Sequence, residues 1–137
     1  MNSSKRYTIA AVIVSIGIIA AAVLAGSFAQ SRTVTLLSTS AFIAKSQEAP
    51  DSIILDVRSK AEFESGHFPN AMNIDADDPQ FDHKVKSLDP SKTYLVYCRS
   101  GRRSAIATQR MSSYGFKHLY ELQGGIAAAA ADAGSQQ

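Results

Sequence analysis

Short apolar runs alternate with stretches of helical character along residues 33–131, and this alternation constrains the fold more than any other feature of the sequence. The expected strands are rich in Val, Ile, Leu and Tyr and lie at residues 33–37, 53–57, 71–74, 93–98 and 118–122. The expected helices lie at residues 41–44, 60–64, within 75–89, 104–111 and 126–131. Strands that are joined through helices run parallel in a sheet covered on both faces. We therefore expect an α/β fold with a central, mostly parallel sheet of about five strands and helices on both faces.

The first 29 residues differ in composition from the rest of the chain. Residues 1–8 are short and positive, residues 9–26 carry no charge, and residues 27–29 offer the small residues that a signal peptidase requires. A helix of about 18 residues would reach about 27 Å, close to the thickness of a bilayer core, so an uncleaved membrane anchor is an alternative to a cleaved signal peptide. Because the positive flank stays inside, both alternatives predict a periplasmic or otherwise extracytoplasmic domain.

The remainder of the chain is close to neutral, because twelve acidic residues face twelve basic ones once Lys5 and Arg6 are set aside. This balance argues against a nucleic-acid partner, which requires a sustained basic face. The length allows one domain at 33–131, with a tail at 132–137. The spacing of the three histidines and the single cysteine matches no metal site, so we expect neither a metal nor another cofactor. The oligomeric state is not determined by these features.

Cys98 is the only cysteine, and it stands between the apolar run Tyr94–Tyr97 and an arginine-rich loop with a glycine at its centre. Such a loop can direct several backbone N–H groups inward, and the helix that follows adds its positive end. Both effects favour the thiolate, and a thiolate in electropositive, partly exposed surroundings is the reactive form. The position beyond the carboxyl end of a parallel strand is where such sheets form their sites. We therefore predict a nucleophile, the alternative being a free cysteine that fills space as a small apolar residue.

Several segments, taken together, resemble the rhodanese-like domain family. They keep the order and spacing of the family across about residues 33–131, and they are Leu55-Asp56-Val57-Arg58, Glu62-Phe63, Gly66-His67-Phe68-Pro69-Asn70-Ala71, Cys98-Arg99-Ser100-Gly101-Arg102-Arg103-Ser104 and Leu122-Gln123-Gly124-Gly125. The resemblance, which is to exported single-domain members, implies a thiosulfate sulfurtransferase. In that chemistry a cysteine thiolate takes the outer sulfur of a small anionic donor, holds it as a persulfide, and passes it to cyanide or a thiol.

The resemblance also implies roles for individual residues. Cys98 would be catalytic, and the substrate-binding residues would be those of the loop that follows it, namely Arg99, Ser100, Gly101, Arg102, Arg103 and Ser104. The arginines can offset the repulsion between a thiolate and a dianion, and backbone N–H groups can surround the persulfide if Gly101 lets the loop fold back. We expect Arg103 to point inward. Ser104 is expected either to contribute its hydroxyl or to cap the following helix.

Four other positions of the family pattern are expected to be structural residues near the site. Asp56 and Arg58 end a buried strand, and Arg58 can pair with Glu62 or Asp56 because a buried charge requires a partner. His67 stands beside a glycine turn, where a bond to the backbone is more common than a role as a base. The sequence departs from the family pattern in two places, with alanines at 127–131 instead of an aromatic residue, and with Asn70, which tolerates left-handed backbone, instead of a glycine.

Two alternatives to sulfur transfer by an enzyme stay open. Phosphatases and arsenate reductases of the same architecture also use a cysteine in an anion-binding loop, but they place five residues between cysteine and arginine. Here four residues separate Cys98 from Arg103. A shorter loop favours a sulfur atom over a tetrahedral phosphate. The second alternative is a non-enzymatic sulfur carrier or redox-binding module that docks on a membrane partner and uses Cys98 stoichiometrically.

Overall fold

The computed structural model describes residues 34–48 and 51–135, and the structural statements below concern this part of the chain. The leader predicted at residues 1–29 lies outside it. Ten elements alternate along the chain, in the order β1 (Thr35–Leu37), α2 (Thr39–Glu48), β2 (Ile53–Asp56), α3 (Lys60–Glu64), β3 (Met72–Asn73), α4 (Phe81–Lys86), β4 (Thr93–Tyr97), α5 (Arg102–Ser113), β5 (His118–Leu122) and α6 (Gly125–Gly134). The alternation predicted from the sequence is confirmed.

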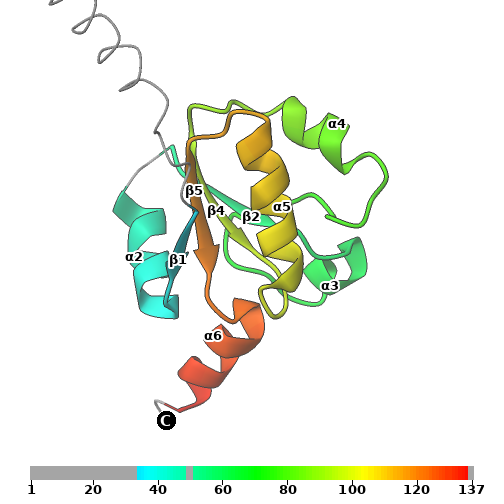
Figure 1. Ribbon diagram of the computed structural model, residues 1–137. Coiled ribbons are helices and arrows are strands. Elements are labelled where there is room, and N and C mark those ends of the chain that lie inside the picture. Colours follow the sequence, from blue (N-terminus) through cyan, green and yellow to red (C-terminus); the bar gives the residue numbers. More distant parts are fainter. Residues whose placement is uncertain (1–33, 49–50, 136–137) are drawn as a thin grey trace, which may run out of the picture. The chain divides into compact units, whose positions relative to one another are not determined.

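The five strands form one sheet in the order β1-β5-β4-β2-β3, and every pairing is parallel (Figure 1). The first strand therefore lies at an edge beside the last, with Leu36 opposite Glu121. β4 lies at the centre, with Val96 opposite Leu55 on one side and Glu121 on the other. The carboxyl ends of β2 and β4 are consequently neighbours, and the loops after these two strands meet at one edge of the sheet.

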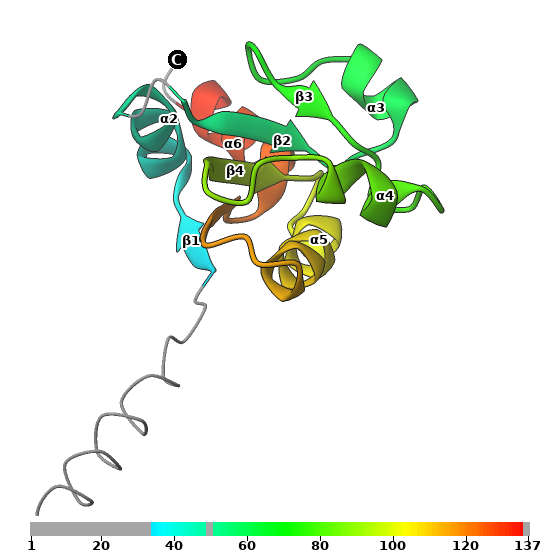
Figure 2. The ribbon, with the colours of Figure 1, turned by 90° about the horizontal axis from the view of Figure 1, so that it is seen from above.

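Helices cover both faces of the sheet, with α2 and α6 on one face and α4 and α5 on the other (Figure 2). The residues of β4 alternate between two buried clusters, as expected for a strand covered on both sides. Tyr94 and Val96 face Met111 of α5, whereas Leu95 and Tyr97 lie in the cluster with Phe42 of α2. The expected fold class is therefore confirmed, down to the helices on both faces.

The boundaries of several helices and strands differ from those predicted. α2 extends to Glu48 and α6 to Gly134, because alanine and other good helix formers continue both segments. In the polar stretch 75–89, the side chains of Asp75 and Asp78 accept hydrogen bonds from backbone N–H groups two residues ahead, so the helix is delayed until Phe81. The third strand is reduced to two residues.

Two local features of the backbone lie at the start of α3 and in the turn after it. α3 begins with a capping box, in which the Ser59 hydroxyl accepts from the Glu62 N–H and the Glu62 carboxylate accepts from the Ser59 N–H. Asn70 adopts a left-handed conformation with φ 61°, which explains why asparagine can replace the usual glycine at this turn.

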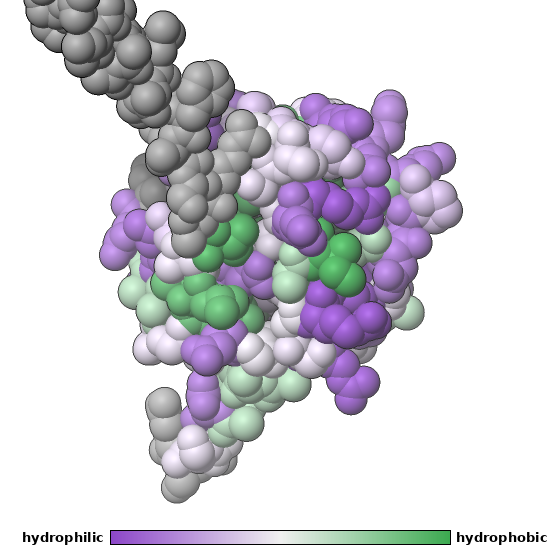
Figure 3. Space-filling view, viewed as in Figure 1, coloured by the Kyte–Doolittle hydropathy of each residue, from purple (hydrophilic) through white to green (hydrophobic). Residues whose placement is uncertain are grey.

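The described part of the chain contains no helix long and apolar enough to span a membrane. Its surface is mixed, and the hydrophobic residues seen in Figure 3 form separate patches among hydrophilic ones. The large apolar side chains that are exposed come from different elements and are Leu36, Ile43, Met72 and Ile106.

Candidate active site

Cys98 lies directly after β4 and is almost completely buried, with 1% of its surface exposed. Its side chain continues the alternation of the strand and joins the cluster of Tyr94 and Val96 on the face covered by α5. The expectation of partly exposed surroundings is therefore wrong for the thiol itself. The reason is the register of β4, which turns every second side chain, Cys98 included, toward the core.

Hydrogen-bond donors converge on the sulfur of Cys98 in spite of its burial. The Gly101 N–H donates to Sγ over 3.1 Å, and the Ser104 hydroxyl lies 3.7 Å from Sγ. Burial raises the pKa of the thiol, but the backbone N–H groups of Ser104, Ser100 and Gly101 and the Ser104 hydroxyl together lower it below its ordinary value. The loop therefore stabilises the thiolate by hydrogen bonds rather than by contact with solvent.

The sharp turn of the loop occurs at Gly101, which has φ 97°. This left-handed conformation suits glycine and brings the chain round so that α5 starts at the next residue. Gly101, not Ser104, is therefore the N-cap of α5, and the predicted cap at Ser104 is wrong. Ser104 is the third residue of the helix, fully buried, with its hydroxyl 3.0 Å from the Gly101 carbonyl. The side chain is thus placed beside Cys98 instead of at the helix entrance.

The start of α6 is hydrogen-bonded to the backbone of the Cys98 loop. The Ile126 N–H donates to the Cys98 carbonyl over 2.9 Å, and the Ala127 N–H donates to the Arg99 carbonyl over 3.1 Å. Gly125 has φ 66°, and a Cβ at this position would collide with the backbone of Cys98 and Arg99. The glycine pair of the family pattern therefore sets how closely α6 approaches the reactive loop.

The three arginines of the loop do not share one environment. Arg99 and Arg102 are exposed, whereas Arg103 points inward and binds Glu62 of α3 through two contacts of 2.7 Å. The Arg103 guanidinium, with smaller contributions from Ser59, lowers the pKa of Glu62 from 4.5 to about 2, and Glu62 raises the pKa of Arg103. Cations in the first turn of a helix oppose its dipole, so Arg102 and Arg103 do not serve the stability of α5.

Asp56 and Arg58 form a closed ion pair at the end of β2. Arg58 donates from Nε and Nη2 to Asp56 over 2.6–3.0 Å, and both residues are buried. Arg58 also donates to the Gly66 carbonyl, and the Asn73 amide donates to the carbonyls of Asp56 and Arg58. Of the two partners considered for Arg58, the structure thus selects Asp56, while Glu62 is taken by Arg103.

His67 is exposed and lies within hydrogen-bond distance of the Phe63 carbonyl, 2.8 Å from Nδ1, with its ring stacked on the ring of Phe63. This is the backbone bond expected for a histidine at this turn. Among the described residues, no group of three or more His, Cys, Asp and Glu side chains is arranged to hold a metal ion.

Sequence reasoning missed Glu121 and Thr108, which lie behind Ser104. Glu121 of β5 is 5% exposed, accepts from the Thr108 hydroxyl over 2.5 Å, and lies 3.3 Å from the Ser104 hydroxyl. The available signal was a single charge inside the apolar run 118–122, in a strand that the sheet buries. The hydroxyl of Ser104 thus joins the Cys98 sulfur to a buried carboxylate.

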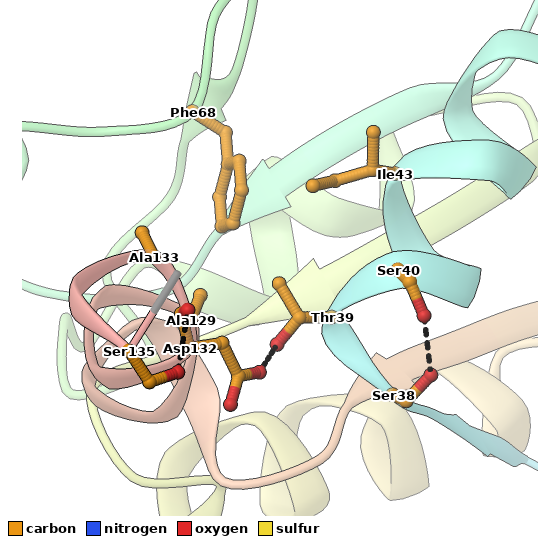
Figure 4. Close-up of a pocket in the computed structure, with 9 residues that line it drawn as sticks. All are labelled: Ser38, Thr39, Ser40, Ile43, Phe68, Ala129, Asp132, Ala133 and Ser135. Atoms are coloured by element: carbon orange, nitrogen blue, oxygen red, sulfur yellow. Dashed lines mark hydrogen bonds between the residues drawn. The ribbon is translucent and has the colours of Figure 1, made fainter. Parts of the chain in front are cut away.

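The hollow between α2 and α6 is a separate feature from the Cys98 loop. Figure 4 shows it lined by Ile43 and Phe68 on its apolar side, with Thr39 donating to Asp132 across the two helices over 2.6 Å. Its volume is about 500 Å³, and none of its lining residues belongs to the loop 98–104. A smaller hollow of about 340 Å³ includes Arg99 and lies against α3 and α6.

Comparison with known proteins gives the family of this chain. The family model of the rhodanese-like domain matches residues 39–132. Among solved structures, a rhodanese-related protein from Thermoplasma volcanium has a TM-score of 0.62 at 26% identity, covering 72% of this chain and 92% of that chain. A protein from Rhodopseudomonas palustris described as a possible tyrosine phosphatase has a TM-score of 0.58 at 28% identity, covering 74% of this chain and 82% of that chain.

The curated relatives are longer proteins. The tRNA uridine(34) hydroxylase of Pectobacterium carotovorum is 37% identical over 81 residues, which are 56% of this chain and 23% of that protein. The enzyme of the same name from Cytophaga hutchinsonii is 37% identical over 83 residues, which are 58% of this chain and 27% of that protein. This chain thus spans about a quarter of the length of these relatives. The family match, the parallel sheet and the cysteine loop together show that the chain belongs to the rhodanese-like domain family.

Proposed function

We propose that this protein is a sulfurtransferase that carries a sulfane sulfur as a persulfide on Cys98. The observation that supports the proposal best is the convergence of the Gly101 N–H and the Ser104 hydroxyl on Sγ, which lowers the pKa of a buried thiol. A thiol that is both buried and stabilised as a thiolate suits a reaction in which the sulfur itself carries the transferred atom.

The reaction divides into two displacements at sulfur. In the first, the Cys98 thiolate attacks the outer sulfur of thiosulfate, the S–S bond of thiosulfate breaks, and sulfite leaves with the bonding electron pair. In the second, cyanide or an acceptor thiolate attacks the outer sulfur of the persulfide, and Cys98 leaves as a thiolate. The exposed guanidinium groups of Arg99 and Arg102 attract the dianionic donor, and the N–H groups of the loop stabilise the terminal sulfur.

A phosphatase or arsenate reductase is the less favoured alternative. An arginine that binds a tetrahedral oxyanion uses both of its terminal N–H groups. In this chain, both terminal nitrogens of Arg103 already bind Glu62, and the loop is one residue shorter than in those enzymes. A non-enzymatic sulfur carrier is the other alternative, and it shares the persulfide but lacks turnover. The hydroxylase chemistry of the curated relatives is not part of the proposal, because this chain spans so little of those proteins.

The test is intact mass spectrometry of the full chain after treatment with thiosulfate, followed by addition of cyanide. We expect a gain of one sulfur, about 32 Da, that cyanide removes as thiocyanate. Cys98→Ser should lose the gain completely, and Ser113→Ala, an exposed substitution in the last turn of α5, should keep it. A gain that persists in Cys98→Ser would refute the proposal. A persulfide without repeated turnover would indicate a carrier, and hydrolysis of an aryl phosphate without sulfur uptake would indicate a phosphatase.

We also propose that the protein acts outside the cytoplasm, on the basis of the charged and apolar pattern of residues 1–29. The same mass spectrum of protein isolated from cells distinguishes a chain cleaved after Ala29 from an intact, membrane-anchored one. Recovery of an intact chain from the cytosolic fraction would contradict this placement.

A further inference from the structure

The smaller of the two hollows described above, the Arg99 hollow, lies directly against the Cys98 loop. Its volume of about 340 Å³ is at the lower end of the range for small-molecule sites and has room for about ten water-sized groups. Arg99 lines it on the side of the loop. Ile126 and Ala127 line it on the side of α6, and their N–H groups bind the Cys98 and Arg99 carbonyls. A molecule in this hollow therefore lies next to the residue that would carry the persulfide.

The wall that α6 contributes to the Arg99 hollow is apolar. Ile126, Ala127 and Ala130 form it, and the two alanines, three residues apart, share one face of the helix. Both alanines are exposed, so the width of the hollow on this side is limited only by two methyl groups. Thiosulfate and cyanide have no hydrocarbon part that could pack on this wall. An organic molecule does, and it gains free energy by covering the apolar surface.

The charges that line the Arg99 hollow are balanced except for one. Arg58 is paired with Asp56, and Glu62 binds both terminal nitrogens of Arg103. Among the described residues, the Arg99 guanidinium has neither an ion-pair partner nor a hydrogen-bond partner. The hollow therefore has one uncompensated positive charge, on the side of the reactive loop. The planar guanidinium can bind a carboxylate through two parallel hydrogen bonds.

We propose that the Arg99 hollow binds the sulfur acceptor and that this acceptor is a small organic thiol with a carboxylate group; the inference rests on the proposed persulfide at Cys98. Arg99 binds the carboxylate, and the hydrocarbon part packs on Ala127 and Ala130, which thereby determine the size of the acceptor. Sulfite has left before the acceptor reacts, so the guanidinium that attracts the donor is available again for the acceptor.

The step that follows is a displacement at sulfur. The acceptor thiolate attacks the outer sulfur of the protonated persulfide and forms a new S–S bond. The bond between the outer sulfur and Cys98 Sγ breaks, and its electron pair stays on Cys98. The proton remains on the transferred sulfur, so the products are an organic persulfide and the Cys98 thiolate.

The test measures this displacement alone, on the full chain that has been loaded with thiosulfate and then freed of the donor. The probes are 3-mercaptopropionate, its neutral analogue 3-mercapto-1-propanol, and cyanide as an acceptor without a hydrocarbon part. Mass spectrometry follows the loss of the added sulfur, and the two thiols are compared at equal thiolate concentration. We expect the carboxylate thiol to react several-fold faster than the neutral thiol.

Arg99→Gln removes the unpaired charge of the hollow and should abolish the preference for the carboxylate thiol. Arg102→Gln, the matched control, removes the same charge from an exposed residue of the same loop that does not line the hollow, so the preference should remain. Equal rates for the two thiols in the wild type, or a preference that survives in Arg99→Gln, would overturn the inference.

Ala130→Phe places a large side chain in the hollow from an exposed position on α6, where it does not disturb the core. The rate with 3-mercaptopropionate should fall about tenfold more than the rate with cyanide. Ala131→Phe, the same substitution at the next, exposed residue outside the hollow, should change neither rate. Equal slowing of both acceptors in Ala130→Phe would contradict a binding site for the thiol. If the wild type took up no sulfur from thiosulfate, the proposed function itself would be wrong, and this inference with it.

Discussion

The ends of β2 and β4 are neighbours in the sheet, yet their buried polar groups are satisfied in opposite ways. At the end of β2, the Asp56 carboxylate and the Arg58 guanidinium bind each other over 2.6–3.0 Å, so the two opposite charges neutralise each other. At the end of β4, the Cys98 sulfur accepts from the Gly101 N–H and lies 3.7 Å from the Ser104 hydroxyl oxygen, with no cation in direct contact among the described residues. The end of β2 is therefore a structural ion pair, whereas the donors at the end of β4 can stabilise a negative charge on the Cys98 sulfur.

This difference shows how one sheet edge combines rigidity with reactivity. The Arg58 guanidinium of this pair also binds the Gly66 carbonyl just after α3, and α3 in turn presents Glu62 to Arg103 of the reactive loop. The ion pair at the end of β2 thus helps to fix the position of α3. Through Glu62, α3 helps to fix the loop whose donors surround the Cys98 thiol at the end of β4. Substitutions at the two ends should accordingly have separable effects on stability and on chemistry.

The largest expected effect on stability is that of Asp56→Ala, which leaves the Arg58 guanidinium buried and unpaired. Breaking a buried pair in this way costs about 3–5 kcal/mol, which denaturant unfolding measures. Glu64→Ala, which removes an exposed partner of Lys60, is the matched control and should cost less than about 1 kcal/mol. Equal effects of the two substitutions would show that the end of β2 is not the scaffold described above.

Gly125→Ala should have the next largest effect, and it acts at the end of β4, where it should change both stability and chemistry. Its left-handed backbone and the collision of a Cβ with the Cys98 and Arg99 carbonyls predict a loss of about 2–3 kcal/mol and slower persulfide formation. Gly134→Ala, at the far end of the same helix and with nothing close to an added Cβ, should be neutral or stabilising. If Gly125→Ala kept the stability and the rate of persulfide formation of the wild type, the close approach of α6 would not be required for the conformation of the Cys98 loop.

The smallest expected effect concerns the pH dependence of the Glu62–Arg103 pair. Because the folded-state pKa of Glu62 is about 2 and its ordinary value is 4.5, the pair contributes stability above pH 4.5 and loses it as the pH falls toward 2. Glu62→Gln should lower stability by about 1 kcal/mol at neutral pH and remove this part of the acid dependence. Urea unfolding across this pH range measures both the loss of stability at neutral pH and the acid dependence. An unchanged acid dependence in Glu62→Gln would contradict a stabilising role of the Glu62–Arg103 pair.

Much of the fold follows from local patterns in the sequence. The short apolar runs predicted all five strands, and the stretches of helical character between them predicted the helices that connect the strands. The helix boundaries were harder to predict, because each depends on one side chain or one backbone angle. The side chains of Asp75 and Asp78 form turns that delay α4, and the left-handed backbone of Gly101 sets the start of α5. Such features depend on the neighbours that the folded chain provides.

By itself, the sequence determined the class of fold, the position of Cys98 after a central strand and the residues of its loop, because these depend on periodicity and on contacts within a few residues. Only the tertiary structure decided that the thiol is buried, that Arg103 binds Glu62 and that Glu121 lies behind Ser104. These contacts join residues 41 and 17 positions apart, brought together by the order and parallel register of the strands. The physical reason is that burial and ion pairing depend on which strands become neighbours, and local pattern does not specify that order.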